Sequence, residues 1–379
     1  MKYKIIIDAT TIRNSVDGLS QYIIGLINNL PEDSFYLFDY TILINPGVKR
    51  EELNSALQSN KFRILVKKIS PIGPKRDWDM FWFLLKNKNK FDLFHSTSNQ
   101  YPLFLKKGIA TIHDIIFLNY FDAPWWTFNF ARHYMSFVIK KSLSNSAAVI
   151  AVSGATKNEL IKSYKLNKPG KIQVIHEGWE HLSSMSDKND VQPSNLINAS
   201  YLFYVGSGRV HKNLIGLIKG FILALNKLAN NINLVISGNM QHISKEIKIL
   251  IDIANKDSKR IIFTGFISNE LLKTTFIKAD AFIFPSLNEG FGIPILESFY
   301  FKKPLLCSNI PCFTEIAGNA ALYFDPTKPE EIAKTMLLFY DNPVTWASLI
   351  EKGHERLKLF SWKKTSVETV AVYTKILLN

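Results

Sequence analysis

A chain of 379 residues is long for a single hydrophobic core and suits two domains. Its hydrophobic content of 47% and charged content of 21% are typical of an ordinary globular protein. The 46 Lys and Arg residues outnumber the 32 Asp and Glu residues, and the net charge of +14 favours phosphorylated substrates, anionic lipid or nucleic acid as partners. A general lysine bias explains part of this excess. No Arg-rich run and no aromatic RNA-binding signature occurs, so we expect no nucleic-acid partner.

The cysteine content and the apolar runs bear on the compartment. Cys307 and Cys312 are too few and wrongly spaced for a zinc site or a disulfide framework, which favours a reducing, cytoplasmic location. The apolar run at the N-terminus is short and stops at Asp8, so we expect no signal peptide. No apolar stretch reaches the roughly 18 residues that a membrane span needs. Membrane contact, at the inner face of the cytoplasmic membrane, is therefore expected to be peripheral.

In the first half of the chain, strand-like apolar runs alternate with helical patterns, which predicts doubly wound α/β layers. A loop over 14–18 precedes a predicted helix with apolar residues at 19, 22, 23, 26 and 27, which Pro31 stops. Strands are predicted at 5–7, 40–44, 62–66, 92–98, 109–115, 148–153 and 172–175.

Three segments of this half allow more than one interpretation. Asp77 and Asp79 form an Asp-x-Asp that follows no apolar strand, so we expect no metal motif there and predict that Asp77 is a helix N-cap. The aromatic segment 124–141, with Arg132 and two lysines, is either a helix packed on the sheet or an acceptor or membrane surface. Thr156 opens a further helix with a cap-like pattern.

Two predicted strands each end in a histidine. Ligands of open α/β sheets lie beyond the carboxyl ends of the strands, where His113 is followed directly by Asp114. This position favours a site role for His113. For His95, a structural role and a site role remain equally open.

The polar run 182–200 predicts a linker, after which a second α/β half begins. A glycine-containing turn, 206–213, follows its first strand and resembles a phosphate cradle, in which Arg209 and Lys212 supply two cations. Solvated surface cations are the alternative. Strands are predicted at 201–205, 234–238, 261–265, 281–284, 304–308 and 321–324, and the terminal segment 361–378 is amphipathic.

The stretch 284–297 predicts a strand, a tight turn and a helix. Gly290 and Gly292 permit the turn, and Pro294 suits the first turn of a helix. The backbone N–H groups of Phe291, Gly292 and Ile293 would then form an anion site.

Two carboxylates, Glu289 and Glu297, frame this anion site. Because carboxylates repel phosphate but accept hydrogen bonds from hydroxyl groups, the set suits a nucleotide sugar. An ordinary strand–loop–helix unit with a glutamate near the helix start is the alternative.

The Glu-x7-Glu spacing in 285–298, together with 263–267 and 315–326, resembles retaining glycosyltransferase family 4 over nearly the whole chain. The sequence of these motifs is closest to that of bacterial mannosyltransferase-like enzymes of surface-polysaccharide biosynthesis. The resemblance implies a GT-B fold, in which two doubly wound Rossmann-like domains face each other across a cleft. The implied parts are an acceptor-side domain (1–181), a linker (182–200), a nucleotide-sugar domain (201–360) and a terminal helix that crosses back (361–379).

The resemblance also assigns roles to single residues. His113 would lie beside the transferred sugar, Arg209 and Lys212 would hold the diphosphate, and Glu297 would bind the ribose. Glu289 would bind the sugar and stabilise positive charge at the anomeric carbon. Catalytic roles are implied for His113, Arg209, Lys212 and Glu289. Donor contacts are implied for Gly18, Arg209, Lys212, Ile267, Glu289, Gly290, Phe291, Gly292, Ile293 and Glu297. Gly18 stands alone where the family commonly has a glycine pair.

The implied reaction is retaining, metal-independent transfer of a hexosyl group to a glycan or polyprenyl-linked saccharide, without a cofactor. Within the family, the motifs of this chain fit mannosyl transfer from GDP-mannose in polysaccharide, O-antigen or lipopolysaccharide biosynthesis best. The alternatives are a nucleotide-sugar epimerase of the same fold, a glycoside hydrolase using Glu289 and Glu297, and a non-catalytic nucleotide-sugar-binding protein.

Overall fold

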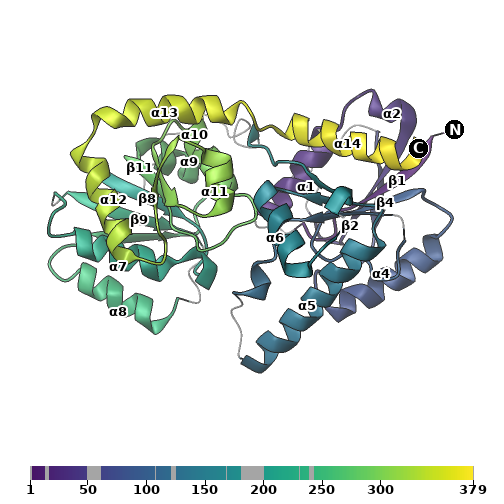
Figure 1. The fold of residues 1–379 in the computed structure, drawn as a ribbon, viewed down its shortest axis with the longest axis horizontal. Helices are drawn as coiled ribbons and strands as arrows, with labels where there is room; N and C mark the ends of the chain where they lie inside the picture. Colours follow the sequence, from purple (N-terminus) through teal and green to yellow (C-terminus); the bar gives the residue numbers. More distant parts are fainter. Residues whose placement is uncertain are drawn as a thin grey trace. The chain divides into compact units, whose positions relative to one another are not determined.

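The computed structural model describes residues 2–12, 17–48, 61–106, 108–120, 125–167, 169–180, 200–229, 231–238 and 243–378. These residues form two compact units (Figure 1). The first unit contains the described residues up to 180 together with those from 360 onward, and the second contains the described residues between 200 and 359. The second unit is therefore an insertion in the chain of the first. The predicted linker at 182–200 lies almost entirely outside the described residues.

The first unit is built on a seven-stranded parallel sheet in the order β3-β2-β1-β4-β5-β6-β7. Its strands are β1 (Tyr3–Asp8), β2 (Phe38–Ile44), β3 (Arg63–Val66), β4 (Leu93–Ser96), β5 (Ile109–Ile112), β6 (Ala148–Ala151) and β7 (Ile172–Val174). The strand order reverses direction between β1 and β4, and doubly wound sheets place their ligand sites at such a switch point.

The helices of the first unit are α1 (Gly18–Asn28), α2 (Ser34–Leu37), α4 (Pro74–Asn87), α5 (Trp125–Asn145), α6 (Gly154–Tyr164) and α14 (Trp362–Leu378). The predicted helix before Pro31 is confirmed as α1. Asp17 caps it by accepting a hydrogen bond from the Ser20 amide, and Tyr22 and Leu26 lie on its buried face.

Two predicted helix caps are wrong. Helix α4 begins at Pro74, with Gly73 as its cap, because Pro suits the first turn and Gly73 adopts a φ of 89°. Asp77 lies inside the first turn, buried, where it accepts hydrogen bonds from Tyr134 and from Gln100 (3.0 Å). Ser153, and not Thr156, caps α6, since its hydroxyl accepts from the backbone N–H of Thr156 at 3.0 Å.

Helix α14 packs into the first unit over two glycines. A Cβ atom at Gly25 would lie 2.3 Å from the ring of Trp362, and one at Gly178 would lie 2.1 Å from its backbone nitrogen. The hydroxyl of Ser366 donates to the carbonyl of Leu26 at 2.9 Å. The last helix therefore completes a unit that begins at the other end of the chain.

The second unit is built on a six-stranded parallel sheet in the order β10-β9-β8-β11-β12-β13. Its strands are β8 (Ser200–Val205), β9 (Ile232–Ser237), β10 (Ile261–Gly265), β11 (Ala281–Phe284), β12 (Leu305–Ser308) and β13 (Ala321–Phe324). Its helices are α7 (Leu214–Ala224), α8 (Lys245–Ala254), α9 (Asn269–Lys278), α10 (Ile293–Tyr300), α11 (Pro311–Ala317), α12 (Pro329–Asp341) and α13 (Val344–Leu357). Here the strand order reverses between β8 and β11, and the expectation of two doubly wound Rossmann-like domains is confirmed.

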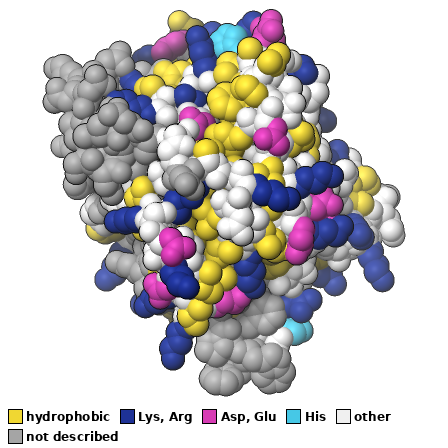
Figure 2. All heavy atoms as spheres, turned by 90° about the vertical axis from the view of Figure 1, so that its left-hand side faces the viewer, with side chains coloured by type: hydrophobic (Ala, Val, Ile, Leu, Met, Phe, Trp, Pro, Cys, Tyr) yellow, Lys and Arg dark blue, Asp and Glu magenta, His cyan; other side chains and the backbone are white. Residues whose placement is uncertain are grey.

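The positive charge of the second unit is spread out on the face that carries α7, α8 and α12. Figure 2 shows Lys and Arg side chains scattered there among acidic and hydrophobic ones. Along the described parts of the chain, no helix has the length and apolar character needed to cross a membrane.

Candidate functional site

The loops that follow β8 and β11 lie together at the switch point of the second sheet. The backbone N–H of Leu287 donates to the carbonyl of His211 at 2.7 Å. The side chain of Asn213, a residue in the left-handed conformation (φ 56°), donates to the carbonyl oxygens of Pro285 (3.0 Å) and Pro326 (2.7 Å). These contacts fix the predicted phosphate cradle against the Glu-x7-Glu stretch.

Lys212 and Glu289, which are 77 residues apart in sequence, form an ion pair in which Nζ lies 2.6 Å from Oε1. The same carboxylate oxygen accepts a hydrogen bond from the hydroxyl of Ser286 at 2.7 Å, and Nζ lies 5.3 Å from the centroid of the Phe284 ring. The side chains of Lys212 and Glu289 are 20% and 11% exposed. The ammonium is thus held in place and still accessible, and an incoming anion would compete with Glu289 for it.

Arg209 stands one turn before Lys212, at the start of a short 3-10 helix (Val210–Lys212). The backbone N–H of Lys212 donates to the carbonyl of Arg209 at 3.0 Å, which ties the two residues into one turn. The Arg209 side chain is exposed, and its guanidinium makes no hydrogen bond or ion pair with the residues that the structure describes. Arg209 is therefore available to an anionic ligand.

The backbone of the loop after β8 packs closely against the end of β9. Gly238, which follows β9, adopts a φ of 130°, and a Cβ atom there would lie 1.8 Å from the carbonyl oxygen of Gly206. The backbone N–H of Gly206 donates to Ser237 at 3.0 Å. The sequence placed Gly238 at the end of a strand without a role, because such a contact between two loops has no local signature.

Helix α10 starts at the predicted place. Gly292 caps it in the left-handed conformation (φ 101°), Pro294 lies in its first turn, and Phe291 and Ile293 are buried. Glu297 lies on α10 and is only 6% exposed, so little of its carboxylate surface faces solvent.

Two predicted donor contacts belong to other elements of the structure. Ile267 follows β10, two strands away from β8 in the sheet, and is partly buried. Gly18 is the first residue of α1 in the first unit, and most of the predicted loop before it lies outside the described residues.

In the first unit, His113 follows β5 directly, as predicted. Its Nδ1 lies 3.2 Å from Oε1 of Glu177, and its Nε2 lies 3.0 Å from the carbonyl oxygen of Thr97. Burial lowers the pKa of His113, but Glu177, the Thr97 carbonyl and the charge of Asp114 raise it by more, so the pKa lies above its ordinary value. Glu177 was missed because the two partners are 64 residues apart in sequence.

His95 on β4 is fully buried, and both of its ring nitrogens contact hydroxyl groups. Nδ1 lies 2.6 Å from the hydroxyl of Tyr373 on α14, and Nε2 lies 2.8 Å from that of Thr111 on β5. Burial, and then the nearby His113, lower the pKa of His95 to about 3. This setting favours the structural interpretation of His95.

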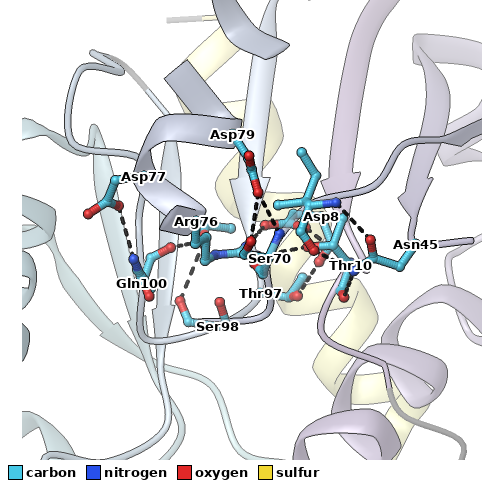
Figure 3. A network of polar contacts seen from close by, with 12 residues as sticks. Asp8, Thr10, Asn45, Ser70, Arg76, Asp77, Asp79, Thr97, Ser98 and Gln100 are labelled. Atoms are coloured by element: carbon cyan, nitrogen blue, oxygen red, sulfur yellow. Dashed lines mark hydrogen bonds and ion pairs between the residues drawn. The ribbon is translucent and has the colours of Figure 1, made fainter. Parts of the chain in front are cut away.

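A buried polar network lies at the carboxyl end of β1 (Figure 3). Asp8 pairs with the guanidinium of Arg76 and accepts a hydrogen bond from the hydroxyl of Thr10 at 2.6 Å. Three buried polar atoms in this region, Arg76 Nε, Thr11 Oγ1 and Ser98 Oγ, have no hydrogen-bond partner within the described structure. The sequence indicated none of this network, because Asp8 marked only the end of an apolar run.

The described residues contain no candidate metal site, because no three or more of their His, Cys, Asp or Glu side chains are arranged to hold an ion. Cys307 and Cys312 are buried, and neither forms a disulfide.

Comparison with known proteins agrees with the two-part architecture. Residues 16–180 match the family model described as Glycosyltransferase Family 4, and residues 186–356 match the model described as Glycosyl transferases group 1. Among curated proteins, the chain is 24% identical to O-antigen chain mannosyltransferase B of Escherichia coli, over 98% of this chain and 99% of that protein. It is 27% identical to the O-antigen chain mannosyltransferase RfbU of Salmonella typhimurium, over 85% and 86% of the two chains.

Among solved structures, the chain is similar to HepE of Anabaena in complex with UDP and glucose, with a TM-score of 0.73, 14% identity and coverage of 98% of this chain and 100% of that one. At this identity the likeness shows the fold alone. The resemblance seen in the sequence is therefore confirmed by family models for both halves and by relatives that span nearly the whole chain. This chain is a GT-B glycosyltransferase and belongs to glycosyltransferase family 4.

Proposed function

We propose that this enzyme transfers a mannosyl group from GDP-mannose, with retention of configuration, to a glycan or polyprenyl-linked saccharide during O-antigen or related polysaccharide synthesis. Two relatives that match most of the chain are O-antigen mannosyltransferases by name, which supports the sugar and the acceptor class. The observation that carries the chemistry is the contact between Lys212 and Glu289 beside Arg209 at a sheet switch point.

The charges at this switch point suit departure of a nucleoside diphosphate. Negative charge builds on the leaving phosphate, and Arg209 and Lys212 supply preorganised cations for it. A phosphate that takes the ammonium of Lys212 would free Glu289 to accept hydrogen bonds from the sugar hydroxyls. The first residues of α10 would add backbone N–H groups, and Glu297 would accept from the ribose. In this proposal the donor binds to the second unit.

The acceptor belongs on the first unit in this proposal. Polar side chains gather at the end of β1, and one of them, Thr11, has a hydroxyl with no partner among the described residues, which is suited to a hydroxyl group of a saccharide. His113, at the end of β5 in the same sheet, would lie beside the transferred sugar.

A peripheral membrane contact, at the inner face of the cytoplasmic membrane, would suit a polyprenyl-linked acceptor. The sequence predicted a membrane surface at 124–141. In the described structure, however, a group of exposed aromatic side chains that contact one another lies on α4 and the loop after β4. Trp78 and Phe104 are 63% and 71% exposed. Phe81 joins them, with ring centroids 6.4 Å from Trp78 and 5.2 Å from Phe104. Exposed lysines on the same segments, Lys75, Lys86 and Lys106, match an anionic lipid surface.

The membrane contact is tested by cosedimentation with anionic vesicles. Binding should weaken as salt rises and should be lost in the double variant Trp78→Ser/Phe104→Ser. Phe266→Ser, which removes an aromatic residue 76% exposed on the second unit, is the matched control and should bind as the wild type does. Equal recovery of the wild type with and without anionic lipid would refute the contact.

The proposed reaction is tested by measuring GDP release from GDP-mannose with and without a mannose-containing acceptor. A transferase releases GDP in step with formation of a new glycosidic bond, whereas an epimerase or a binding protein needs no acceptor. Activity should persist in excess EDTA, because the protein's own cations would take the place of a metal ion. A panel of other nucleotide sugars, screened by thermal shift, tests the choice of donor.

A further inference from the structure

Both ring nitrogens of His113 are engaged within the first unit. Nε2 faces the carbonyl oxygen of Thr97 at 3.0 Å, and Nδ1 faces a carboxylate oxygen of Glu177 at 3.2 Å. A backbone carbonyl only accepts hydrogen bonds, so Nε2 must carry a proton. The protonation of His113 therefore depends on which side of the contact with Glu177 holds the second proton.

The surroundings favour a proton on Nδ1. Glu177 is buried, and an ionised carboxylate there needs a cationic partner. Asp114, the next residue along the chain, adds a second negative charge and raises the pKa of His113 further.

Among the residues that the structure describes, the other groups that face His113 supply no competing positive charge. The ring of Tyr22 on α1 meets that of His113 edge to face, with centroids 4.7 Å apart. His95, whose charge would repel that of His113, stays neutral because burial lowers its pKa to about 3. The loop is fixed as well, since the Asn99 side chain accepts from the His113 amide at 2.7 Å and donates to the Asp114 carbonyl at 3.1 Å.

We propose that Glu177 is a positioning residue that holds His113 as an imidazolium, so that His113 acts as a fixed positive charge and neither accepts nor gives up a proton during the reaction. The protonation state is argued from this unit alone, whereas its use in the reaction rests on the proposed function. A doubly protonated ring has no lone pair with which to accept a proton from an acceptor hydroxyl. Its contribution is attraction for the oxygen-rich, anionic donor at pH values where an ordinary histidine is neutral.

The protonation state can be measured directly by nitrogen NMR of histidine-labelled protein. The signals of His113 are assigned by their loss in His113→Asn. In the wild type both ring nitrogens should remain protonated above the ordinary histidine pKa, and in Glu177→Gln the pKa of His113 should fall. Glu177→Asp, which keeps the carboxylate, should restore it in part. An unprotonated Nδ1 in the wild type at neutral pH would overturn the proposal.

The pH dependence of kcat/KM separates a charge effect from a merely structural one. Glu177→Gln should lose activity by about tenfold per pH unit above the lowered pKa of His113 and recover it on acidification. Glu246→Gln, which removes a carboxylate from an exposed ion pair with Lys219, is the matched control and should keep the wild-type profile.

The outcomes distinguish this inference from the proposed reaction. A loss of activity in Glu177→Gln that is equal at every pH, with an unchanged pKa of His113, would overturn the positioning role. An imidazolium in the wild type, combined with no transfer from any nucleotide sugar, would support the protonation state and refute the proposed reaction.

Discussion

Two histidines on neighbouring strands are held in opposite protonation states by their partners. His95 contacts two hydroxyl groups and is fully buried, whereas His113 contacts a carbonyl and a carboxylate. Hydroxyl groups can donate to a neutral ring, but carbonyl and carboxylate oxygens only accept. The residue type alone therefore says little about charge in this part of the first unit.

The lowered pKa of His95 makes the first unit sensitive to acid. Below about pH 6.5 an unfolded His95 binds a proton that the folded chain rejects, so this stabilisation is present above that pH and is lost as the pH falls toward about 3. Between about pH 6.5 and pH 5 the loss should be about 2 kcal/mol. His113 has the opposite sign, because its raised pKa gives a stabilisation that is lost as the pH rises through the folded value.

Urea unfolding of the wild type and of His95→Gln at several pH values measures this effect. The variant should be less stable at neutral pH but should lose less stability on acidification. His133→Gln, which changes an exposed histidine on α5, is the control and should follow the wild type. The assignment to His95 is wrong if both variants show the wild-type pH dependence.

Arg209 and Lys212 lead to the sharpest kinetic prediction. Both would act more strongly on the departing diphosphate than on the bound donor, so each alanine substitution should lower kcat as well as raise KM. The loss should be on the order of a hundredfold or more in kcat for each variant. Lys219→Ala, which breaks an exposed ion pair on α7 of the same unit, should stay close to the wild type. A near-wild-type kcat in either folded variant would remove that residue from the site.

Positions at strand ends could be predicted from sequence, but their partners could not. His113, Lys212 and Glu289 stand in loops that follow apolar runs, which is a local signal. His113 and its partner Glu177 are 64 positions apart in sequence, and Lys212 and Glu289 are 77 positions apart. Only the folded chain brings the members of each pair together. The prediction that Asp77 caps a helix was wrong because α4 already begins at Pro74, with Gly73 as its cap.

At the scale of elements, the strands were the most predictable part of the fold. Each strand of the described structure coincides with a predicted apolar run, because parallel strands covered on both faces are apolar throughout. Helix starts were less predictable, as Ser153 and Thr156 show: the two residues can cap equally well by type, and the backbone geometry decides between them.

Helix α14 packs so closely against the first unit that the effect of a substitution at this contact can be predicted. Gly178→Ala should destabilise the first unit by about 1–3 kcal/mol, because the new Cβ atom would meet the backbone nitrogen of Trp362, which cannot turn aside as a side chain can. Gly170→Ala, at a glycine of the same unit with no atom within 4 Å of the added Cβ, should be close to neutral. Unfolding midpoints of the two variants decide the matter, and equal midpoints would contradict the predicted contact.

At the scale of the whole molecule, α14 should matter to one unit and not to the other. A chain that ends at Leu359 loses Trp362 and the partner of His95, Tyr373, both of which belong to the first unit. We expect its first unit to be unstable while the second remains folded, which limited proteolysis followed by mass mapping can show. Protection of the first unit in the shortened chain would contradict this expectation.

The discontinuity of the first unit has a consequence during synthesis on the ribosome. The two glycine seats, Gly25 and Gly178, are translated long before Trp362, the residue that fills them. At roughly 5–20 residues per second, the chain between Gly178 and Trp362 takes about 10–40 s to emerge. The second unit can be complete before the first, and the residues of the first unit that α14 covers stay exposed for that interval. A chaperone that binds exposed apolar segments would therefore meet this chain at its N-terminal unit, and release would come only with the last helix.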